Sequence, residues 1–363
     1  MNKPIQKILF LSMSAGAGHK RAAQALFLSC KQNYPAIDCY HLDILDYSTK
    51  FLNLNTAQAY HFLVKYFPFI YRLAYKFTDS PKTAILIEKL SGLFALNSPK
   101  LQEFIKNYSP DLIIATHFLI PAMIKKNFPD LPIDMIITDY GLHGFWLNPK
   151  IRNFYTATPE ISKALTTRGL LAHNTGLPID PDFYEEKNLN SLKIKYSIKP
   201  DSPTILIMSG GFGLKNQKFL IKEILQNFPD FNLLVIAGKN NKKLVKKYLS
   251  LKKENTKNYQ VFEFIEKIDD LISVADIIIT KPGGITLTEC LLLNKKIILT
   301  EPIPGQEKLN EEYFLKKTLA IKENKKEIVE QIKSLLTEQK PKKTEIKNPG
   351  KTILEIAFKN TSV

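Results

Sequence analysis

Residues 279–314, ITKPGGITLTECLLLNKKIILTEPIPGQEKLNEEYF, contain the pattern that decides the fold. A β-branched run at 275–280 predicts a strand, and a Pro-Gly-Gly turn follows it directly. The next residues predict a helix over 286–293, a second buried strand over 296–300 and then a loop bracketed by prolines. A strand, a helix and a second strand in this order are typical of a parallel α/β sheet.

The glycines of this turn predict a ligand site. Gly283 and Gly284 let the backbone approach a ligand closely, and the N–H groups of a helix that starts here favour an anion. Glu289 follows Thr286 by about one helical turn, so its carboxylate points toward the helix mouth. A carboxylate would repel a diphosphate, but it suits the two hydroxyl groups of a nucleotide ribose. A βαβ turn with a surface glutamate is the other interpretation that this segment alone leaves open.

The whole run resembles the donor-binding segment of nucleotide-sugar glycosyltransferases that modify lipids. These are the diacylglycerol glucosyl- and galactosyltransferases (MGDG synthase-like, glycosyltransferase family 28), related to the enzyme that adds N-acetylglucosamine to the peptidoglycan lipid precursor. Their pattern, K-x-G-G-x-T-x-x-E and then P-x-x-G-Q-E-x-x-N, is matched by Lys281, Gly283, Gly284, Thr286, Glu289, Pro302, Gly305, Gln306, Glu307 and Asn310. The resemblance implies two Rossmann-like domains facing across a cleft, the GT-B type.

The composition excludes several classes of protein. The chain has 363 residues, 44% hydrophobic and 24% charged, so it is globular and long enough for two domains. Three cysteines without a C-x-x-C spacing fit a reducing cytosol and argue against a disulfide framework or a zinc site. No run approaches the roughly 18 apolar residues of a membrane-spanning helix. A net charge of +16 suits nucleic acid, an anionic membrane surface or a phosphorylated substrate, but no nucleic-acid-binding motif is found.

Predicted strands alternate with predicted helices along the chain. The strands lie at 7–13, 37–42, 112–116, 133–138, 153–157, 204–209, 232–238, 259–262, 277–280 and 296–300, and helices include 20–33, 98–108, 121–127 and 349–358. This alternation predicts an α/β fold with two Rossmann-like domains, each with a parallel sheet. The polar stretch 185–203 predicts a boundary between an N-terminal domain at 1–184 and a C-terminal domain at 185–345. In the resembled family, a last helix, here within 346–363, packs back on the N-terminal domain.

A glycine loop opens each half of the chain, and the second loop, SGGFG at 209–213, predicts a diphosphate site. Its backbone N–H groups can hold a diphosphate without a metal, whereas a merely tight turn is the alternative. The resemblance assigns the diphosphate to this loop, the ribose to Glu289, the uracil to backbone near Phe264 and Ile265, and the sugar to Gln306. The full predicted donor-binding set is Gly210, Gly211, Gly213, Phe264, Ile265, Pro282, Gly283, Gly284, Thr286, Glu289, Gln306, Glu307 and Asn310.

The first glycine loop, SAGAGH at 14–19, provides the candidate catalytic base, His19. At a helix start the dipole keeps an imidazole neutral, so His19 can accept a proton near pH 7. A lone histidine at a helix start is more often a capping or surface residue. The family pattern G-x-G-H favours the catalytic role and places Gly16 and Gly18 on the acceptor side. Ser14 replaces an acidic or polar residue of some members, which leaves open whether a carboxylate assists His19.

A third motif, TDYGLHGFW at 138–146, resembles the family's T-D-x-x-x-H-x-x-W. Asp139 follows a buried strand and is the alternative candidate for the base, or for the residue that orients His19. His143 and Trp146 are predicted to line the acceptor side of the cleft. A turn aspartate and a packed tryptophan are the structural alternatives.

Residues 51–77 predict contact with a membrane. They carry nine aromatic side chains, with Lys65, Arg72 and Lys76 among them. Aromatic rings mixed with cations suit the headgroup region of a bilayer. A buried helical pair with ordinary aromatic packing is the alternative.

The sequence therefore predicts an inverting glycosyltransferase that needs neither a metal nor a cofactor. It would move a hexose from a UDP-hexose, either UDP-glucose or UDP-galactose, to diacylglycerol or another lipid acceptor. It is expected to be peripheral (monotopic) at the cytoplasmic face of the cell membrane, bound to an anionic surface and not to nucleic acid. The alternatives are N-acetylglucosamine transfer to the peptidoglycan lipid precursor, a UDP-sugar epimerase, and a non-catalytic UDP-sugar sensor at the membrane.

Overall fold

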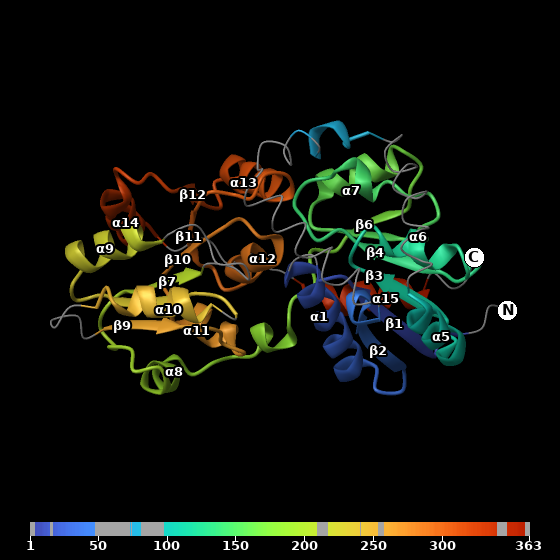
Figure 1. Cartoon of the computed structure of the whole chain (residues 1–363), viewed down its shortest axis with the longest axis horizontal. Coiled ribbons are helices and arrows are strands. Elements are labelled where there is room, and N and C mark those ends of the chain that lie inside the picture. The colour runs from blue at the N-terminus through green and yellow to red at the C-terminus, as the bar shows by residue number, and fades with distance from the viewer. Residues whose placement is uncertain are drawn as a thin grey trace. The chain divides into compact units, whose positions relative to one another are not determined.

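The structure is a computed structural model that describes residues 4–14, 17–47, 73, 75–80, 98–208, 217–239, 241–252, 258–339 and 347–359. The chain forms two compact units, each with its own sheet (Figure 1). The first unit comprises Met1–Pro181, Ile303–Asn310 and Ile346–Val363, and the second comprises Asp182–Pro302 and Glu311–Glu345. The loop Ile303–Asn310 thus belongs with the first unit, although it lies inside the C-terminal domain that the sequence predicts at 185–345.

The first unit contains a parallel sheet with the strand order β2-β1-β3-β4-β5-β6. Its strands are β1 (Lys7–Ser12), β2 (Asp38–Asp43), β3 (Leu112–Ala115), β4 (Ile133–Ile136), β5 (Phe154–Thr156) and β6 (Ala172–Asn174). Successive side chains of a strand point to opposite faces. Leu9 and Leu11 of β1 accordingly pack into one core, whereas Ile8 and Phe10 pack into another. Both faces of this sheet are therefore buried, as is usual for parallel sheets.

Helices cover this sheet on both faces. Those in the described residues are α1 (Ala17–Asn33), α5 (Pro99–Tyr108), α6 (Ile120–Lys125), α7 (Pro159–Thr166) and α15 (Pro349–Lys359), with the 3₁₀ turns η1 (Ile44–Tyr47) and η2 (Gly144–Trp146). The last helix, α15, lies against α1 over the face that carries Ile8 (Figure 1). Local signals set the helix ends: the Thr158 hydroxyl caps α7, and Ser109 ends α5 in the left-handed conformation.

The second unit contains a parallel sheet with the strand order β12-β11-β10-β7-β8-β9. Its strands are β7 (Thr204–Met208), β8 (Asn232–Ile236), β9 (Tyr259–Phe262), β10 (Ile277–Thr280), β11 (Lys296–Leu299) and β12 (Ile321–Lys322). The helices of this part of the chain are η3 (Pro181–Tyr184), α8 (Leu189–Lys195), α9 (Lys218–Asn227), α10 (Lys242–Leu249), α11 (Ile268–Val274), α12 (Gly284–Leu292), α13 (Gln306–Lys316) and α14 (Ile328–Thr337). This strand order is that of the dinucleotide-binding fold.

The predicted α/β class with two Rossmann-like domains is confirmed. Every predicted strand is found within two residues of its expected bounds, but the sequence does not predict β6 and β12, because such short strands carry no periodicity. Two helices begin earlier than predicted: α1 at Ala17 instead of residue 20, and α12 at Gly284 instead of residue 286. In α12 the N–H of Leu287 bonds to the carbonyl oxygen of Gly283 at 3.0 Å, so the glycines belong to the helix start.

The structure also describes the cysteines, the apolar character of the helices and the grouping of side chains that could bind a metal. The cysteines Cys30, Cys39 and Cys290 are free and buried. Of the helices in the described ranges, none has both the length and the apolar character that a membrane crossing requires. The same ranges contain no group of three His, Cys, Asp or Glu side chains arranged to hold a metal ion.

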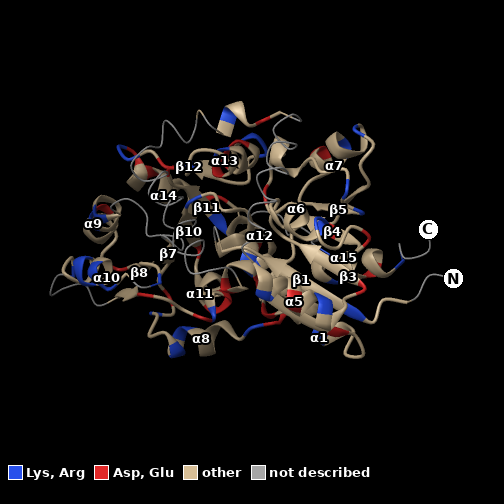
Figure 2. Ribbon diagram, turned by 45° about the vertical axis from the view of Figure 1, so that its right-hand side comes forward, with Lys and Arg blue, Asp and Glu red and all other residues tan. Residues whose placement is uncertain are grey.

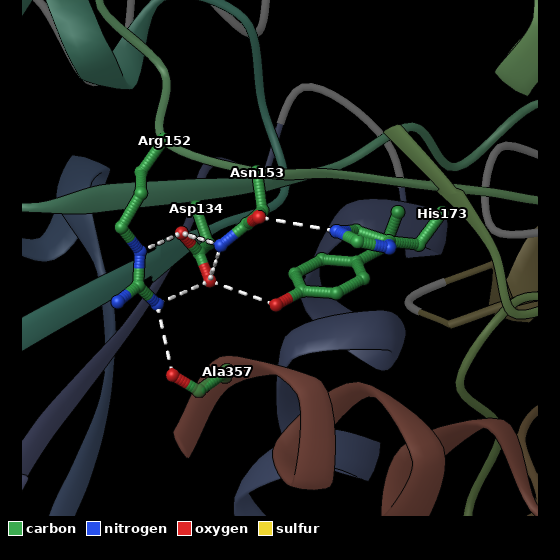
Figure 3. Close-up of polar contacts among 6 residues, drawn as sticks. Asp134, Arg152, Asn153, His173 and Ala357 are labelled. Atoms are coloured by element: carbon green, nitrogen blue, oxygen red, sulfur yellow. Dashed lines mark hydrogen bonds and ion pairs between the residues drawn. The ribbon is translucent and has the colours of Figure 1, made fainter. Parts of the chain in front are cut away.

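A buried carboxylate joins two strands of the first sheet to the C-terminal helix (Figure 3). Asp134 of β4 accepts hydrogen bonds from Nε and Nη2 of Arg152, each at 2.8 Å. The hydroxyl group of Tyr155 donates to the same carboxylate at 2.8 Å, and the amide of Asn153 donates at 3.2 Å. Arg152 also donates to the carbonyl oxygen of Ala357 in α15 at 3.1 Å. Because Arg152 bonds both to Asp134 and to the backbone of α15, this cluster fastens the last helix to the sheet.

Candidate active site

The first sheet has a topological switch point between β1 and β3. The chain that leaves β1 passes through α1 to β2 on one side, whereas the strands after β3 lie on the other side. Open α/β sheets bind ligands in the crevice outside the carboxyl ends of the strands at such a point. His19, in the first turn of α1, and the pair Thr116 and His117, directly after β3, lie at this switch point.

The ring of His19 is held in one tautomer by backbone. Its Nδ1 lies 2.5 Å from the carbonyl oxygen of Thr116, and a carbonyl only accepts hydrogen bonds, so Nδ1 carries the hydrogen. The hydroxyl oxygen of Thr138, just after β4, lies 3.1 Å from the same nitrogen. The hydroxyl of Thr116 donates to the carbonyl oxygen of His19 at 2.9 Å, which also fixes the backbone. In the neutral ring, Nε2 therefore presents a lone pair, and none of the described residues is bonded to it.

Burial lowers the pKa of His19 to about 4, although the hydrogen bond to Thr116 and the charge of Asp43 act in the opposite direction. Asp43 ends β2 and accepts hydrogen bonds from the backbone N–H and the hydroxyl group of Ser14. The sequence leaves open whether a carboxylate assists from position 14. In the structure Ser14 instead holds the carboxylate of Asp43 in the neighbourhood of His19. The imidazole is thus neutral at physiological pH, as a general base must be before reaction.

His117 and Trp146 surround the ring of His19. The His117 ring packs edge-on, with the ring centroids 4.8 Å apart and the planes at 73°. The Trp146 ring centroid lies 6.3 Å from that of His19. Trp146, which is predicted to line the acceptor side, therefore lies beside the candidate base. His117, which also lies there, is not among the residues predicted from the sequence.

His143 supports the loop in which it lies. Its Nδ1 accepts a hydrogen bond from the N–H of Phe145 at 3.2 Å and so caps η2. Its Nε2 lies 2.8 Å from the carbonyl oxygen of Tyr75 and donates to it. The next residue, Gly144, donates its N–H to the carboxylate of Asp79 at 2.8 Å. Nδ1 of His143 thus supports the loop itself, whereas Nε2 of His143 and the N–H of Gly144 hold Tyr75 and Asp79 against it.

Asp139 is joined to the loop that contains the GQE motif. Asn310 donates through Nδ2 to Oδ1 of Asp139 at 3.2 Å and accepts the N–H of Tyr140 at 2.7 Å. Within the loop, Glu307 accepts the N–H of Ile303 at 2.8 Å. Asn310 and Glu307 are both buried and shape the loop, while Gln306 remains partly exposed. Asp139 is the alternative candidate for the residue that orients His19. In the structure Nδ1 of His19 is held by Thr116 and Thr138 rather than by a carboxylate.

The second sheet has its own switch point, between β7 and β10. The turn after β10 leads to Gly283, and a β-carbon added there would meet no atom within 4 Å, so the turn is open on that side. Pro282, Gly284 and Glu289 are buried, and Glu289 is only 1% exposed; Thr286 is partly exposed. This end of α12 offers backbone N–H groups together with one buried carboxylate, which can bind an anion and a pair of hydroxyl groups respectively.

Phe264 and Ile265 follow β9 at the carboxyl edge of the same sheet. The Phe264 ring is 55% exposed, which is unusual for a large apolar side chain. The ammonium group of Lys239 lies 5.5 Å from the centre of this ring. An exposed aromatic ring beside a cation can stack on a planar base.

Several predicted site residues lie outside the described residues: Gly16, Gly210, Gly211, Gly213 and the stretch 51–77 except for 73 and 75–77. Gly18 is the second residue of α1, one position before His19. In the sequence, residues 209–216 follow β7, and β7 pairs with β10.

Comparison with known proteins defines the class. A family model for monogalactosyldiacylglycerol (MGDG) synthase matches residues 19–179, and one for glycosyl transferases group 1 matches residues 190–352. The structure of a UDP-GlcNAc 2-epimerase from Neisseria meningitidis aligns with 98% of this chain and 100% of its own, with a TM-score of 0.63 and 15% identity. MurG from Acinetobacter baumannii aligns with 98% and 99% of the two chains, with a TM-score of 0.55 and 15% identity. The protein is a glycosyltransferase of the GT-B architecture.

Two relatives narrow this class to a family. The processive diacylglycerol beta-glucosyltransferase of Bacillus subtilis (strain 168) is 30% identical over 345 residues, which are 92% of this chain and 88% of its own. The enzyme of the same name from Bacillus licheniformis is 32% identical over 371 residues, which are 98% and 92% of the two chains. The chain therefore belongs to the diacylglycerol glycosyltransferase family, as its motifs predict. It is a hexosyltransferase of a family that acts on a lipid acceptor.

Proposed function

We propose that the protein transfers glucose from UDP-glucose to the hydroxyl group of diacylglycerol with inversion at the anomeric carbon. Glucose is favoured over galactose because the relatives that match nearly the whole chain are named glucosyltransferases. The observation that carries the proposal is the hydrogen-bonded state of His19. Its Nδ1–H is held by the carbonyl oxygen of Thr116, which leaves the Nε2 lone pair to accept a proton at the switch point of the sheet.

The proposed reaction is a single displacement. The acceptor hydroxyl gives its proton to Nε2 of His19 while its oxygen bonds to the anomeric carbon. The bond from that carbon to the UDP oxygen breaks, and its electron pair leaves with the diphosphate. Attack opposite the leaving group converts an α-linked donor into a β-linked glycolipid. The backbone N–H groups at the start of α12 favour the charge that develops on the diphosphate, so we propose a reaction without a metal or cofactor.

We also infer that the protein works as a peripheral protein on an anionic membrane surface, at the cytoplasmic face. Helix α10 supports this inference, because it carries Lys242, Lys243, Lys246 and Lys247 (Figure 2). Each basic residue near an anionic leaflet contributes about 1 kcal/mol of attraction.

A transfer assay tests the proposed reaction. The purified protein is incubated with radiolabelled UDP-glucose and vesicles that contain diacylglycerol, and the labelled glycolipid is then treated with β- or α-glucosidase. We expect a product that only β-glucosidase cleaves. Parallel incubations with UDP-galactose and UDP-N-acetylglucosamine measure donor choice. An α-linked product, or product from UDP-N-acetylglucosamine alone, would contradict the proposal.

Co-sedimentation of the protein with vesicles tests the membrane inference when the lipid and the salt are varied. Vesicles with anionic lipid should bind more protein than neutral vesicles at low salt. The difference should shrink as salt is raised, because the screening length falls to about 8 Å at physiological ionic strength. Equal binding to both kinds of vesicle would contradict an electrostatic contribution.

Replacing Glu289 with alanine should lower the affinity for UDP by roughly one to two decades. This range corresponds to the loss of one charge-assisted hydrogen bond to the ribose, worth about 1.5–3 kcal/mol. Titration calorimetry with UDP measures the effect, and Glu330→Ala, whose side chain is 71% exposed on α14 of the same unit, is the matched control. If the folded Glu289→Ala variant binds UDP as well as the wild type does, Glu289 does not bind the ribose.

The acid limb of kcat/KM should lie near pH 4, well below the ordinary histidine pKa of about 6.5. The neutral imidazole is the active form, so activity is retained above the lowered pKa and lost as pH falls through it. The linked stability has the same sign: it is fully present above about pH 6.5 and is lost as pH falls toward 4, because the unfolded state binds the proton first. Initial rates from pH 3.5 to 8, with circular dichroism at each pH, check this prediction; a limb centred near 6.5 in folded protein would refute it.

A further inference from the structure

Three neighbouring histidines in the first unit have tautomers fixed by backbone, and one of them has a donor that the described structure does not use. His143 and His117 share a local arrangement, in which Nδ1 accepts the N–H of the residue two positions later, at 3.2 Å and 3.3 Å respectively. In His143, Nε2–H then donates to a backbone carbonyl oxygen. Within the described ranges, Nε2 of His117 has no corresponding acceptor.

His117 is neutral near pH 7, which determines where its hydrogen lies. The side chain is only 5% exposed, and burial together with the adjacent His19 holds its pKa well below the ordinary value. Since Nδ1 accepts the N–H of Leu119, the one hydrogen of the neutral ring is on Nε2.

His19 and His117 therefore have opposite tautomers. His19 carries its hydrogen on Nδ1 and presents a lone pair at Nε2, whereas His117 presents an N–H at Nε2. The two ring centroids are 4.8 Å apart. The backbone also links the two rings, because Thr116, whose carbonyl oxygen holds His19, immediately precedes His117. One acceptor and one donor side by side are the groups that a single hydroxyl needs: it donates its hydrogen to the first and accepts from the second.

We propose that His117 donates its Nε2–H to the oxygen of the acceptor hydroxyl whose proton His19 accepts. This inference rests on the proposed function and adds a second residue that touches the acceptor. In the reaction the hydroxyl proton passes to His19, the oxygen bonds to the anomeric carbon, and the UDP oxygen leaves with the electron pair. His117 keeps its proton throughout. Its hydrogen bond occupies one lone pair of the oxygen and thereby directs the other lone pair to the anomeric carbon.

A purely structural role for the ring is the alternative. The ring of Phe118 stacks on His117 with a centroid separation of 4.4 Å, and the bond from Leu119 caps the turn before α6. The two roles depend on different nitrogens: the structural role needs Nδ1 as an acceptor, and the proposed role needs Nε2–H as a donor. Substitutions that retain one nitrogen position and lose the other can therefore separate them.

Two variants of His117 provide this separation. In His117→Asn the amide lies near the position of Nδ1, so that its oxygen can still accept the N–H of Leu119 but no donor reaches the Nε2 position. In His117→Gln the longer side chain can place an N–H near the Nε2 position, while the bond from Leu119 is lost. We expect kcat/KM for diacylglycerol to fall about tenfold in His117→Asn, since a net hydrogen bond at the upper end of the usual range, about 1.5 kcal/mol, corresponds to that factor. We expect His117→Gln to retain kcat/KM within about threefold, with the lower melting temperature of the two.

The measurements are initial rates against diacylglycerol concentration, thermal unfolding and UDP affinity by calorimetry. UDP affinity should equal that of the wild type in both variants. Full kcat/KM in His117→Asn, or a loss that occurs only in His117→Gln, would show that the ring is structural and overturn the proposal. If the wild type makes product and both variants match it, only the role of His117 fails. If the wild type transfers no sugar to diacylglycerol, the proposed function fails, and with it the assignment of His117.

Discussion

Replacing His19 with alanine should lower kcat by roughly 10²–10⁴-fold, the usual contribution of a positioned general base, while UDP affinity stays close to that of the wild type. The ring is the only part of this residue that meets the acceptor in the proposed reaction, and the predicted UDP-binding residues at the start of α12 belong to the second unit. Single-turnover rates of glycolipid formation, with UDP titration of the same samples, measure the two effects separately.

His41 provides the matched control for this substitution. Burial lowers its pKa to about 4 as well, but its ring nitrogens are held by the hydroxyl of Ser12 at 2.9 Å and the amide oxygen of Gln24 at 2.8 Å. His41→Asn should therefore affect stability more than kcat. If His19→Ala keeps a nearly normal rate and Asp139→Asn does not, the base is Asp139 and the assignment of His19 is wrong.

The sequence could predict His19 because the signal is local. A strand, a glycine loop and a histidine at the start of a helix are consecutive along the chain, and the same holds for the turn before Glu289. Parallel strands bring their carboxyl ends to one edge, so the pattern also indicates which loops share a site. Periodicity and turn chemistry thus indicate these parts of the fold and the position of the loops, whereas the catalytic role of His19 and the ribose-binding role of Glu289 are expectations that the resemblance to the family implies.

The partners of His19 could not be predicted in this way, because they come from other strands. Asp43, Thr116 and Thr138 lie at the ends of β2, β3 and β4, and only the strand order brings them to one ring. Strand order and register are tertiary properties that a single sequence does not specify. The one available signal for His117 was its position directly after a buried strand that ends at the same edge as β1.

The loop Ile303–Asn310 illustrates the same limit. Its motif is readable in the sequence, and it follows β11 of the second sheet, so chain order assigns it to the C-terminal domain. In the structure it belongs to the first unit, where Asn310 bonds to Asp139 and Leu309 packs against Gly141. The contact depends on side chains more than 160 residues apart, which no local pattern connects.

Replacing Asp134 with asparagine should destabilise the first unit by about 3 kcal/mol, at the lower end of the range for removing one partner of a buried ion pair. Asp134 is fully buried and accepts hydrogen bonds from Arg152, Asn153 and Tyr155. An asparagine of the same shape loses the charge and turns an N–H₂ group toward these donors. The lower end of this energy range is appropriate because the Arg152 side chain is 21% exposed, so its guanidinium group can recover part of its hydration in the variant.

Urea unfolding followed by tryptophan fluorescence suits this test, because the only tryptophan of the chain, Trp146, is buried in the first unit. The signal therefore reports on that unit even if the two units unfold separately, a case in which whole-chain probes would not be two-state. Asp130→Asn, at an exposed position of the same unit, is the control. Arg152 also bonds to the carbonyl oxygen of Ala357, so faster hydrogen exchange in α15 should accompany the loss of stability. An Asp134→Asn variant with unchanged urea midpoint and unchanged exchange in α15 would show that the cluster in Figure 3 does not fasten the helix.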